Sequence, residues 1–127
     1  NINIRRKNFK KLSEFFLKYV KYFNLPEENK GVVTPWLAYP LVIKKNKKFN
    51  RSELQIFLEK NNIQTRVIFT GNILRQPIMK KRNFKKHKYC DKVADDVMKN
   101  GILIGCHHGM SSNDLQFIMK KFREFLN

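Results

Sequence analysis

The side chains best suited to ligand chemistry lie between residues 66 and 77, where a short apolar run leads into a glycine turn. Arg66 and Arg75 carry guanidinium groups, which donate paired hydrogen bonds to phosphate or carboxylate oxygens. Asn72 and Gln76 can each donate and accept hydrogen bonds. Because a loop that follows a strand is a usual place for binding groups, this segment is a candidate ligand site. Ordinary turn chemistry is the alternative, and the residue types leave both interpretations open.

A second group of reactive side chains is the run from Cys106 to His108, with Cys90 sixteen residues before Cys106. Thiol and imidazole groups bind zinc, but structural zinc sites use paired ligands at short fixed spacings, which this pattern lacks. A Cys–His nucleophile needs a third, orienting group, and the sequence specifies none. We therefore expect no metal site, a buried Cys106 at the end of a strand, and the two histidines in the loop that follows.

The densest positive charge lies in residues 80–88, which contain six Lys or Arg. Phe84, His87 and Tyr89 are interleaved with these cations and could stack on nucleic-acid bases. However, the whole chain carries 27 Lys plus Arg against 10 Asp plus Glu, a net charge of +17, and 20 of the 27 are Lys. Nucleic-acid readers favour Arg. We therefore expect a solvated loop without specific nucleic-acid binding, and a basic nucleic-acid-binding module remains the rival function from another class.

Length and composition restrict the remaining function classes. The 127 residues suit one domain, and 42% hydrophobic with 13% aromatic residues exclude a disordered chain. The longest apolar run, residues 36–43, contains a proline and is too short to span a membrane. Signatures of glycine-rich phosphate loops, serine hydrolases, zinc proteases and C-x-x-C sites are absent. Two cysteines form no disulfide framework, so we expect a reduced, cytoplasmic protein.

The candidate site must be positioned by a small α/β, or α+β, fold. Apolar residues three and four positions apart predict a helix over residues 1–25, which Pro26 ends. Hydrophobic patterns and capping signals then predict strands and helices in alternation: strands over 36–43, 65–69 and 102–106, and helices over 50–60, 91–99 and 111–126. Pro40 places the first of these strands at an edge or a bulge. The order implies a small sheet covered on one face by helices.

One longer motif resembles a known enzyme family. Residues 65–77 read Thr-Arg-Val-Ile-Phe-Thr-Gly-Asn-Ile-Leu-Arg-Gln-Pro and resemble a T-R-x-x-F-x-G-N-x-x-R-Q-P stretch. That stretch belongs to the DegT-type nucleotide-sugar aminotransferase family of pyridoxal-phosphate fold type I, in its branch of CDP-4-keto-6-deoxyglucose 3-dehydrases. Other similar segments follow in the family's order: R-x-x-N-F at 5–9, W-x-x-x-P at 36–40, N-R-x-E-L at 50–54 and I-x-T-R at 63–66. Residues 104–111 resemble I-G-x-x-P-G-L-T, although His107 and His108 stand where the family has Tyr and Pro.

The resemblance implies that residues 1–127 are a single C-terminal small domain of a longer enzyme, with residues 1–25 as the interdomain helix. A start without Met, inside a predicted helix, agrees with this expectation. A missing N-terminal large domain would hold pyridoxal or pyridoxamine phosphate and, in the dehydrase branch, an iron–sulfur cluster. Cys90 and Cys106 match none of the cluster positions, so we expect no catalytic, cofactor-binding or metal-binding residue here. The intact enzyme would be a homodimer, and residues 1–127 alone would be inactive.

For the intact protein the resemblance implies a pyridoxamine-phosphate-dependent dehydrase of lipopolysaccharide biosynthesis. It would remove the C3 hydroxyl of a CDP-linked 4-keto-6-deoxyhexose on the way to a 3,6-dideoxysugar. This domain would wall the active site and orient the nucleotide sugar, through Asn72 and Arg75 first and through Arg66, Gln76 and Trp36 second. A sugar aminotransferase of the same family is the alternative, but such enzymes carry a P-L-H-type turn where this chain has residues 71–75.

Overall fold

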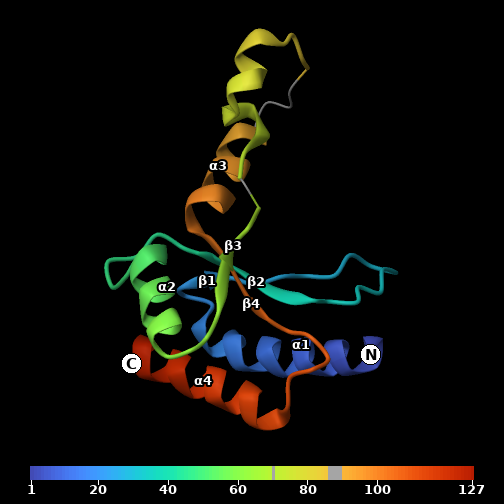
Figure 1. Ribbon diagram of the computed structural model, residues 1–127, viewed down its shortest axis with the longest axis vertical. Coiled ribbons are helices and arrows are strands. Elements are labelled where there is room, and N and C mark those ends of the chain that lie inside the picture. The colour runs from blue at the N-terminus through green and yellow to red at the C-terminus, as the bar shows by residue number, and fades with distance from the viewer. Residues whose placement is uncertain (70, 86–89) are drawn as a thin grey trace.

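Helices and strands alternate along the chain in the computed structural model, which describes residues 1–69, 71–85 and 90–127 (Figure 1). In chain order the elements are α1 (Ile2–Phe16), the 3-10 turn η1 (Leu17–Tyr19), β1 (Phe23–Asn24), β2 (Ala38–Ile43), α2 (Arg51–Lys60), β3 (Thr65–Val67), the 3-10 turns η2 (Ile73–Arg75) and η3 (Pro77–Lys81), α3 (Cys90–Asn100), β4 (Gly101–Gly105) and α4 (Ser112–Leu126). None of the helices in these ranges is both long and apolar enough to cross a membrane.

The strands form one antiparallel sheet in the order β1-β2-β4-β3. At its centre β2 pairs with β4, where Pro40 lies opposite Leu103. β1 pairs only with Val42 and Ile43, at the far end of β2. Pro40 therefore has a neighbouring strand on one side only, a position that tolerates a residue without an N–H donor. The strand that carries Pro40 is thus an inner strand of the sheet, so the predicted edge position is wrong; Pro40 is accommodated because β1 does not extend as far as it.

Helices cover one face of this sheet, as expected. In Figure 1, α1 and α4 lie side by side under the strands and α2 lies next to them. Along β2 the side chains alternate between buried and half-buried, so one face of the strand enters the core and the other does not. α4 presents an apolar stripe at helical spacing to the same core: Leu115, Ile118, Phe122 and Leu126. The mixed helix-and-sheet fold predicted from sequence is confirmed.

Phe16 lies at the centre of the core. Its ring centroid is 4.9 Å from that of Phe122, 5.4 Å from that of Tyr39 and 5.7 Å from that of Phe23, and all four rings are buried. Burying one such ring stabilises the fold by roughly 1.5–3 kcal/mol. The hydroxyl of Tyr39 donates to Ser13 Oγ at 3.1 Å, and burial raises the pKa of Tyr39 above its usual value. The aromatic cluster thus ties α1 and α4 to the sheet.

Reciprocal capping boxes fix the starts of α2 and α4. The Asn50 side chain accepts a hydrogen bond from Glu53 N at 3.1 Å, and Glu53 Oε2 accepts one from Asn50 N at 2.8 Å. Ser111 and Asp114 repeat this arrangement on α4. The hydroxyl and N–H of Ser111 hold the pKa of Asp114 below its usual value. Both predicted helix starts are confirmed.

The first helix is shorter than the residues 1–25 expected from sequence. α1 ends at Phe16, one 3-10 turn follows, and the chain then reverses into β1. Lys44 fixes the reversal, because its ammonium donates to Val20 O at 2.7 Å. Phe23 continues the apolar spacing of the helix, but it reaches the core from a strand. The sheet consequently has a strand, β1, that the sequence analysis did not predict.

Between β3 and β4 the chain extends away from the rest of the molecule and returns (Figure 1). We call residues 68–100 the arm, and residues 1–67 with 101–127 the body. The arm contains η2, η3 and α3, and none of its described residues belongs to the buried apolar core cluster. The strand predicted over 65–69 ends at Val67, and Phe69 already has a φ of 51°. The segment that the sequence marked for ligand chemistry therefore lies largely on the arm.

Candidate functional site

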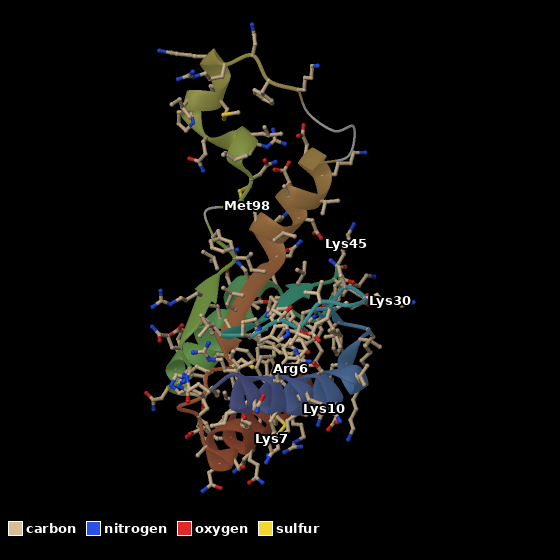
Figure 2. The ribbon with its side chains drawn as sticks, turned by 90° about the vertical axis from the view of Figure 1, so that its right-hand side faces the viewer. Arg6, Lys7, Lys10, Lys30, Lys45 and Met98 are labelled. Carbon is tan, nitrogen blue, oxygen red and sulfur yellow. The ribbon has the colours of Figure 1, made fainter. Side chains whose placement is uncertain are left out.

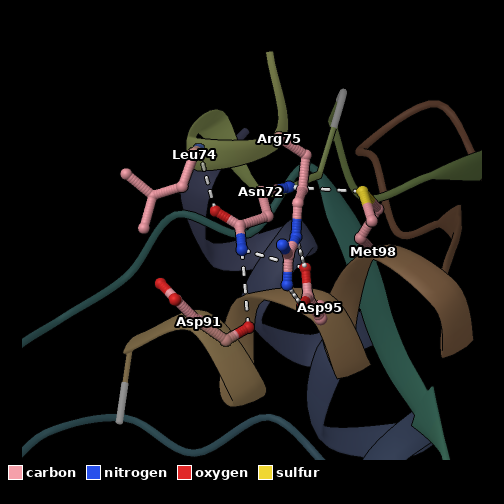
Figure 3. Close-up of polar contacts among 6 residues, drawn as sticks. All are labelled: Asn72, Leu74, Arg75, Asp91, Asp95 and Met98. Carbon is pink, nitrogen blue, oxygen red and sulfur yellow. Dashed lines mark hydrogen bonds and ion pairs between the residues drawn. The ribbon is translucent and has the colours of Figure 1, made fainter. Parts of the chain in front are cut away.

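The predicted ligand loop begins at the base of the arm, directly against α3 (Figure 3). Gly71 has a φ of +83°, a left-handed conformation that strongly favours glycine. A Cβ on Gly71 would lie 2.0 Å from Met98 Cγ, so a larger residue could not approach α3 this closely. The N–H of Asn72 then meets Met98 Sδ at 3.5 Å. Glycine at this position therefore brings the polar residues that follow onto α3.

Asn72 is buried, with 2% of its surface exposed, and its side chain is fully engaged. Nδ2 donates to Asp95 Oδ1 at 2.9 Å and to the backbone oxygen of Asp91 at 3.4 Å, while Oδ1 accepts from Leu74 N at 2.9 Å. Figure 3 shows the amide lying between the loop and α3. Asn72 therefore shapes the loop from inside.

Arg75 lies on the outer side of the same network. Its Nε donates to Asp95 Oδ1 at 3.0 Å, and its Nη2 forms an ion pair with Asp95 Oδ2. The side chain nevertheless keeps 57% of its surface exposed. A guanidinium held by a carboxylate on one edge still has N–H donors on its other edges. Arg75 is therefore oriented by α3 and remains able to bind an external anion.

Asp95 is the residue of this site that the sequence analysis missed. Hydrogen bonds from Arg75 first and from Asn72 second lower its pKa from 3.8 to about 2. Asp95 in turn raises the pKa of Arg75. The helix over 91–99 was assigned by its apolar positions alone, but acidic residues are scarce in this chain. An aspartate pair with helical spacing, Asp91 and Asp95, was the signal that could have marked the face of α3 that binds the loop.

Gln76 completes the group on the arm. Its backbone starts η3, where its oxygen accepts from Met79 N at 3.0 Å, and Pro77 follows at the first position of the turn. Among the described residues its half-buried side chain forms no hydrogen bond. The structure therefore joins Asn72 and Arg75 through Asp95, and Gln76 follows them in the same loop without a side-chain hydrogen bond to either.

Arg66 lies on the body rather than on the arm. It occupies β3 opposite Leu103, and its exposed side chain forms no hydrogen bond or ion pair with any described residue. It borders a cavity of about 380 Å³ whose wall includes Leu37, Leu103 and Met110. That volume falls in the range of small-molecule sites. Arg66 is available for an anionic ligand, but it is not part of the Asn72–Arg75 network.

Trp36 lies in the loop before β2 and contacts α1. Its ring stacks on Phe9 with centroids 4.3 Å apart, and its Nε1 donates to Glu28 Oε1 at 3.2 Å. Glu28 also accepts from the Thr34 N–H, the largest cause of its lowered pKa, and from Arg6. Trp36 is half-buried and holds the loop to the helix.

The Cys106–His108 segment forms the turn between β4 and α4. Cys106 is buried, as predicted, and burial raises the pKa of its thiol to about 11. His107 and His108 are exposed in the turn. Buried Asn8, a member of the R-x-x-N-F motif, holds this turn through a hydrogen bond from its Nδ2 to His107 O at 3.0 Å. In the described parts of the chain no three His, Cys, Asp or Glu residues are grouped as a metal site would require.

The positive charge is distributed over several elements. In Figure 2, Arg6, Lys7 and Lys10 lie along α1, whereas Lys30 and Lys45 lie in the loops on either side of β2. On the arm, the described part of the basic cluster continues η3 with exposed side chains. Residues 86–89, with the predicted stacking residues His87 and Tyr89, lie outside the described residues.

Known proteins resemble this chain over nearly its whole length. A sequence model of the DegT/DnrJ/EryC1/StrS aminotransferase family matches residues 1–123. The chain is 29% identical over 123 residues to lipopolysaccharide biosynthesis protein RfbH of Salmonella typhimurium, covering 95% of this chain and 28% of that protein. It is 31% identical over 108 residues to GDP-4-keto-6-deoxy-D-mannose 3-dehydratase of Escherichia coli, covering 84% and 26%.

A solved structure shares the fold. The Escherichia coli GDP-4-keto-6-deoxy-D-mannose-3-dehydratase with bound hydrated PLP matches with a TM-score of 0.75 and 27% identity. The match covers 94% of this chain and 30% of that chain. The chain thus spans between a quarter and a third of the length of the proteins it resembles. Because the family model matches almost every residue, the chain belongs to the DegT/DnrJ/EryC1/StrS aminotransferase family.

Proposed function

We propose that the intact protein is a PLP- or PMP-dependent enzyme that acts on a nucleotide sugar, and that residues 1–127 are its C-terminal small domain. The observation that carries the proposal is similarity along nearly the whole chain to proteins more than three times as long, among them a sugar 3-dehydratase. A large N-terminal domain and a homodimeric assembly are part of the proposal. We also propose a cytoplasmic location, which the free and buried thiol of Cys106 supports.

Within this family we propose a 3-dehydrase that removes the C3 hydroxyl of a CDP-linked 4-keto-6-deoxyhexose, in 3,6-dideoxysugar and lipopolysaccharide biosynthesis. The Gly71–Asn72 turn supports the dehydrase branch, because it requires glycine against Met98 and a buried asparagine against Asp95. A related 3-dehydratase is named for a GDP-linked sugar. The choice of CDP rests on the motif over residues 65–77.

The contribution of this domain is to wall the active site and orient the nucleotide sugar. Asn72 shapes the loop, Asp95 orients Arg75, and Arg75 presents its exposed donors to oxygen atoms of the substrate. The half-buried Gln76 side chain, which has no hydrogen bond among the described residues, extends the same surface. Arg66 and Trp36 would contribute from the body, Arg66 with its exposed guanidinium and Trp36 by holding the loop before β2.

The starts of α2 and α4 do not fit the phosphate of the cofactor. A cofactor phosphate binds favourably at a helix N-terminus with free N–H groups. In α2 and α4 those positions carry the carboxylates of Glu53 and Asp114, which are already bonded to the caps. Cys106 is buried with a raised pKa and is unsuited to a metal cluster. We therefore propose that the cofactor, which supplies an electron sink, and any iron–sulfur cluster are held outside this domain.

The test is product analysis with the full-length protein, its cofactor and a CDP-linked 4-keto-6-deoxyhexose. A dehydrase forms a sugar that has lost the C3 oxygen, as seen by mass spectrometry and NMR. The second candidate, a sugar aminotransferase, is favoured by the family match and would replace the C4 keto oxygen with nitrogen when an amino donor is added. Release of neither product, with CDP-, GDP- and dTDP-linked sugars all tried, would contradict the proposal.

A further inference from the structure

The arm exposes several large apolar side chains to solvent. Its exposed large hydrophobic residues have between 43% and 85% of their surface in contact with solvent: Phe69, Ile73, Ile78, Phe84 and Val93. None of them belongs to the core cluster or packs against it. Exposed apolar residues are ordinary, and ten others lie on the body, but these five lie on a projecting segment whose described residues contribute nothing to the core cluster. We call these five residues the apolar surface of the arm.

Among the described residues, polar and local contacts join the arm to itself and to the body. Met98 packs on Gly71, and Asp95 binds Asn72 and Arg75. At the base, Arg51 Nη1 donates to Met98 O at 2.7 Å. These are polar or local contacts, and they leave the outer part of η3 without apolar support from the body. A segment built in this way has low local stability unless a further surface covers it.

We propose that the apolar surface of the arm docks on the large domain of the same polypeptide and holds the Asn72–Arg75 loop at the domain boundary. The inference rests on the proposed function, which includes that large domain. Relatives of this chain are more than three times as long, so the small domain has a large intramolecular partner to contact. A tethered partner binds at high effective concentration, which favours it over a separate molecule.

Charge argues against a second copy of this small domain as the occupant. Residues 68–100 contain nine Lys or Arg and only three Asp, and residues 1–127 carry a net charge of +17. Two such surfaces repel one another. The fitting surface is therefore an apolar patch with an acidic rim, facing the exposed cations Lys80, Lys81 and Arg82 beside Ile78.

Hydrogen exchange in the full-length protein tests the docking. The amides of Arg75, Gln76 and Met79 each donate at 3.0 Å within η2 and η3 and report on the arm. We expect Ile78→Asp to accelerate their exchange at least tenfold, and Val93→Asp on α3 to act in the same direction, because a buried charge opposes docking. The matched control is Ile56→Asp on α2 of the body, where Ile56 is 54% exposed, and it should leave the arm amides unchanged.

Light scattering on the same samples measures the molar mass and shows whether the arm docks on its own large domain or on a second copy of the protein. Docking on the protein's own large domain predicts an unchanged mass in Ile78→Asp and Val93→Asp. A molar mass reduced to one half would show that the arm contacts a second copy of the protein. Wild-type arm amides that exchange as fast as those of Ile78→Asp would show that the arm does not dock. Either result overturns the inference. Dehydrase activity is assayed in parallel. Turnover with an unprotected arm rejects only the docking, whereas a protected arm without turnover rejects only the proposed activity.

Discussion

The body and the arm are stabilised by different interactions. In the body, four aromatic rings meet around Phe16, and capping boxes fix two helix starts. In the arm, the Asp95 carboxylate joins the loop to α3, and five large apolar side chains stay exposed. Hydrophobic burial gives the body cooperative stability, whereas exposed polar contacts give the arm less. The difference indicates that the body is stabilised by its own core and that the arm is stabilised by contact with another surface.

Removal of a core ring should have the largest effect. Phe122 is fully buried and meets Phe16 at 4.9 Å, so Phe122→Ala should lower the free energy of unfolding of the 1–127 polypeptide by about 3–5 kcal/mol. The matched change on the arm is Phe69→Ala, where 85% of the side chain is exposed, and it should cost less than about 0.5 kcal/mol. Urea unfolding measures both. Similar losses would remove the distinction between body and arm.

Two glycines with similar backbone conformations test how much the contact with α3 constrains the arm. Gly71 and Gly31 have φ values of +83° and +81°, but a Cβ on Gly31 meets nothing within 4 Å. Gly31→Ala should cost about 1–2 kcal/mol for backbone strain alone. Gly71→Ala should cost about 1–3 kcal/mol more, because Met98 must move. Equal costs in urea unfolding would mean that Met98 yields freely and that the loop does not need glycine for its approach to α3.

The arm should also respond to acid through Asp95. Its pKa is about 2 in the folded protein against an ordinary 3.8. Because the folded pKa is the lower one, the carboxylate contributes stability that is present above about pH 4 and is lost as the pH falls through about 2. Arg75→Ala should raise the pKa of Asp95 toward 3.8 in an NMR titration. Arg123→Ala on α4 is the charge-matched control, and an equal shift there would contradict the pairing.

The smallest difference between the arm and the body should be in DNA binding after positive charge is removed. If nucleic-acid binding is only electrostatic, a short DNA should bind weakly and lose affinity steeply between low salt and about 0.2 M. Three alanines in the arm should then weaken binding as much as three in the body, within about threefold: Lys80, Lys81 and Arg82 against Lys7, Lys10 and Lys18. Tight, sequence-dependent binding near 0.2 M salt that is lost only in the arm variant would support the nucleic-acid-binding alternative.

Local signals in the sequence predicted much of the body. Asn50 with Glu53 and Ser111 with Asp114 are capping pairs three residues apart, so their bonds depend only on the helix they start. Pro40 indicated an edge strand, but β2 is an inner strand; β1 pairs only with Val42 and Ile43, so Pro40 has a neighbour on one side and its missing N–H donor is tolerated. β1 was missed because Phe23 fits a helical period, while the hydrogen bond that turns the chain comes from Lys44, far along the sequence.

The candidate site was predicted as a list of residue types but not as an arrangement. The motif groups Asn72, Arg75 and Gln76 because they are neighbours in one loop, and their role as substrate contacts stays a prediction. Their partner Asp95 lies 20 residues from Arg75, and no pattern within the loop indicates it. Nor could the sequence separate a buried amide from an exposed guanidinium. Burial of Asn72 depends on the close approach of Gly71 to α3, which is a tertiary contact.

The most direct test of the account is the steady-state kinetics of Arg75→Ala in the full-length enzyme, with a thermal melt on the same preparation. If the arm presents Arg75 to the nucleotide sugar, kcat/KM should fall about ten- to a hundredfold while cofactor binding and Tm persist. Arg75→Lys should recover little, because an ammonium cannot reproduce the planar fork that Asp95 orients. An unchanged kcat/KM with a lowered Tm would contradict the account and make Arg75 a structural residue of the arm.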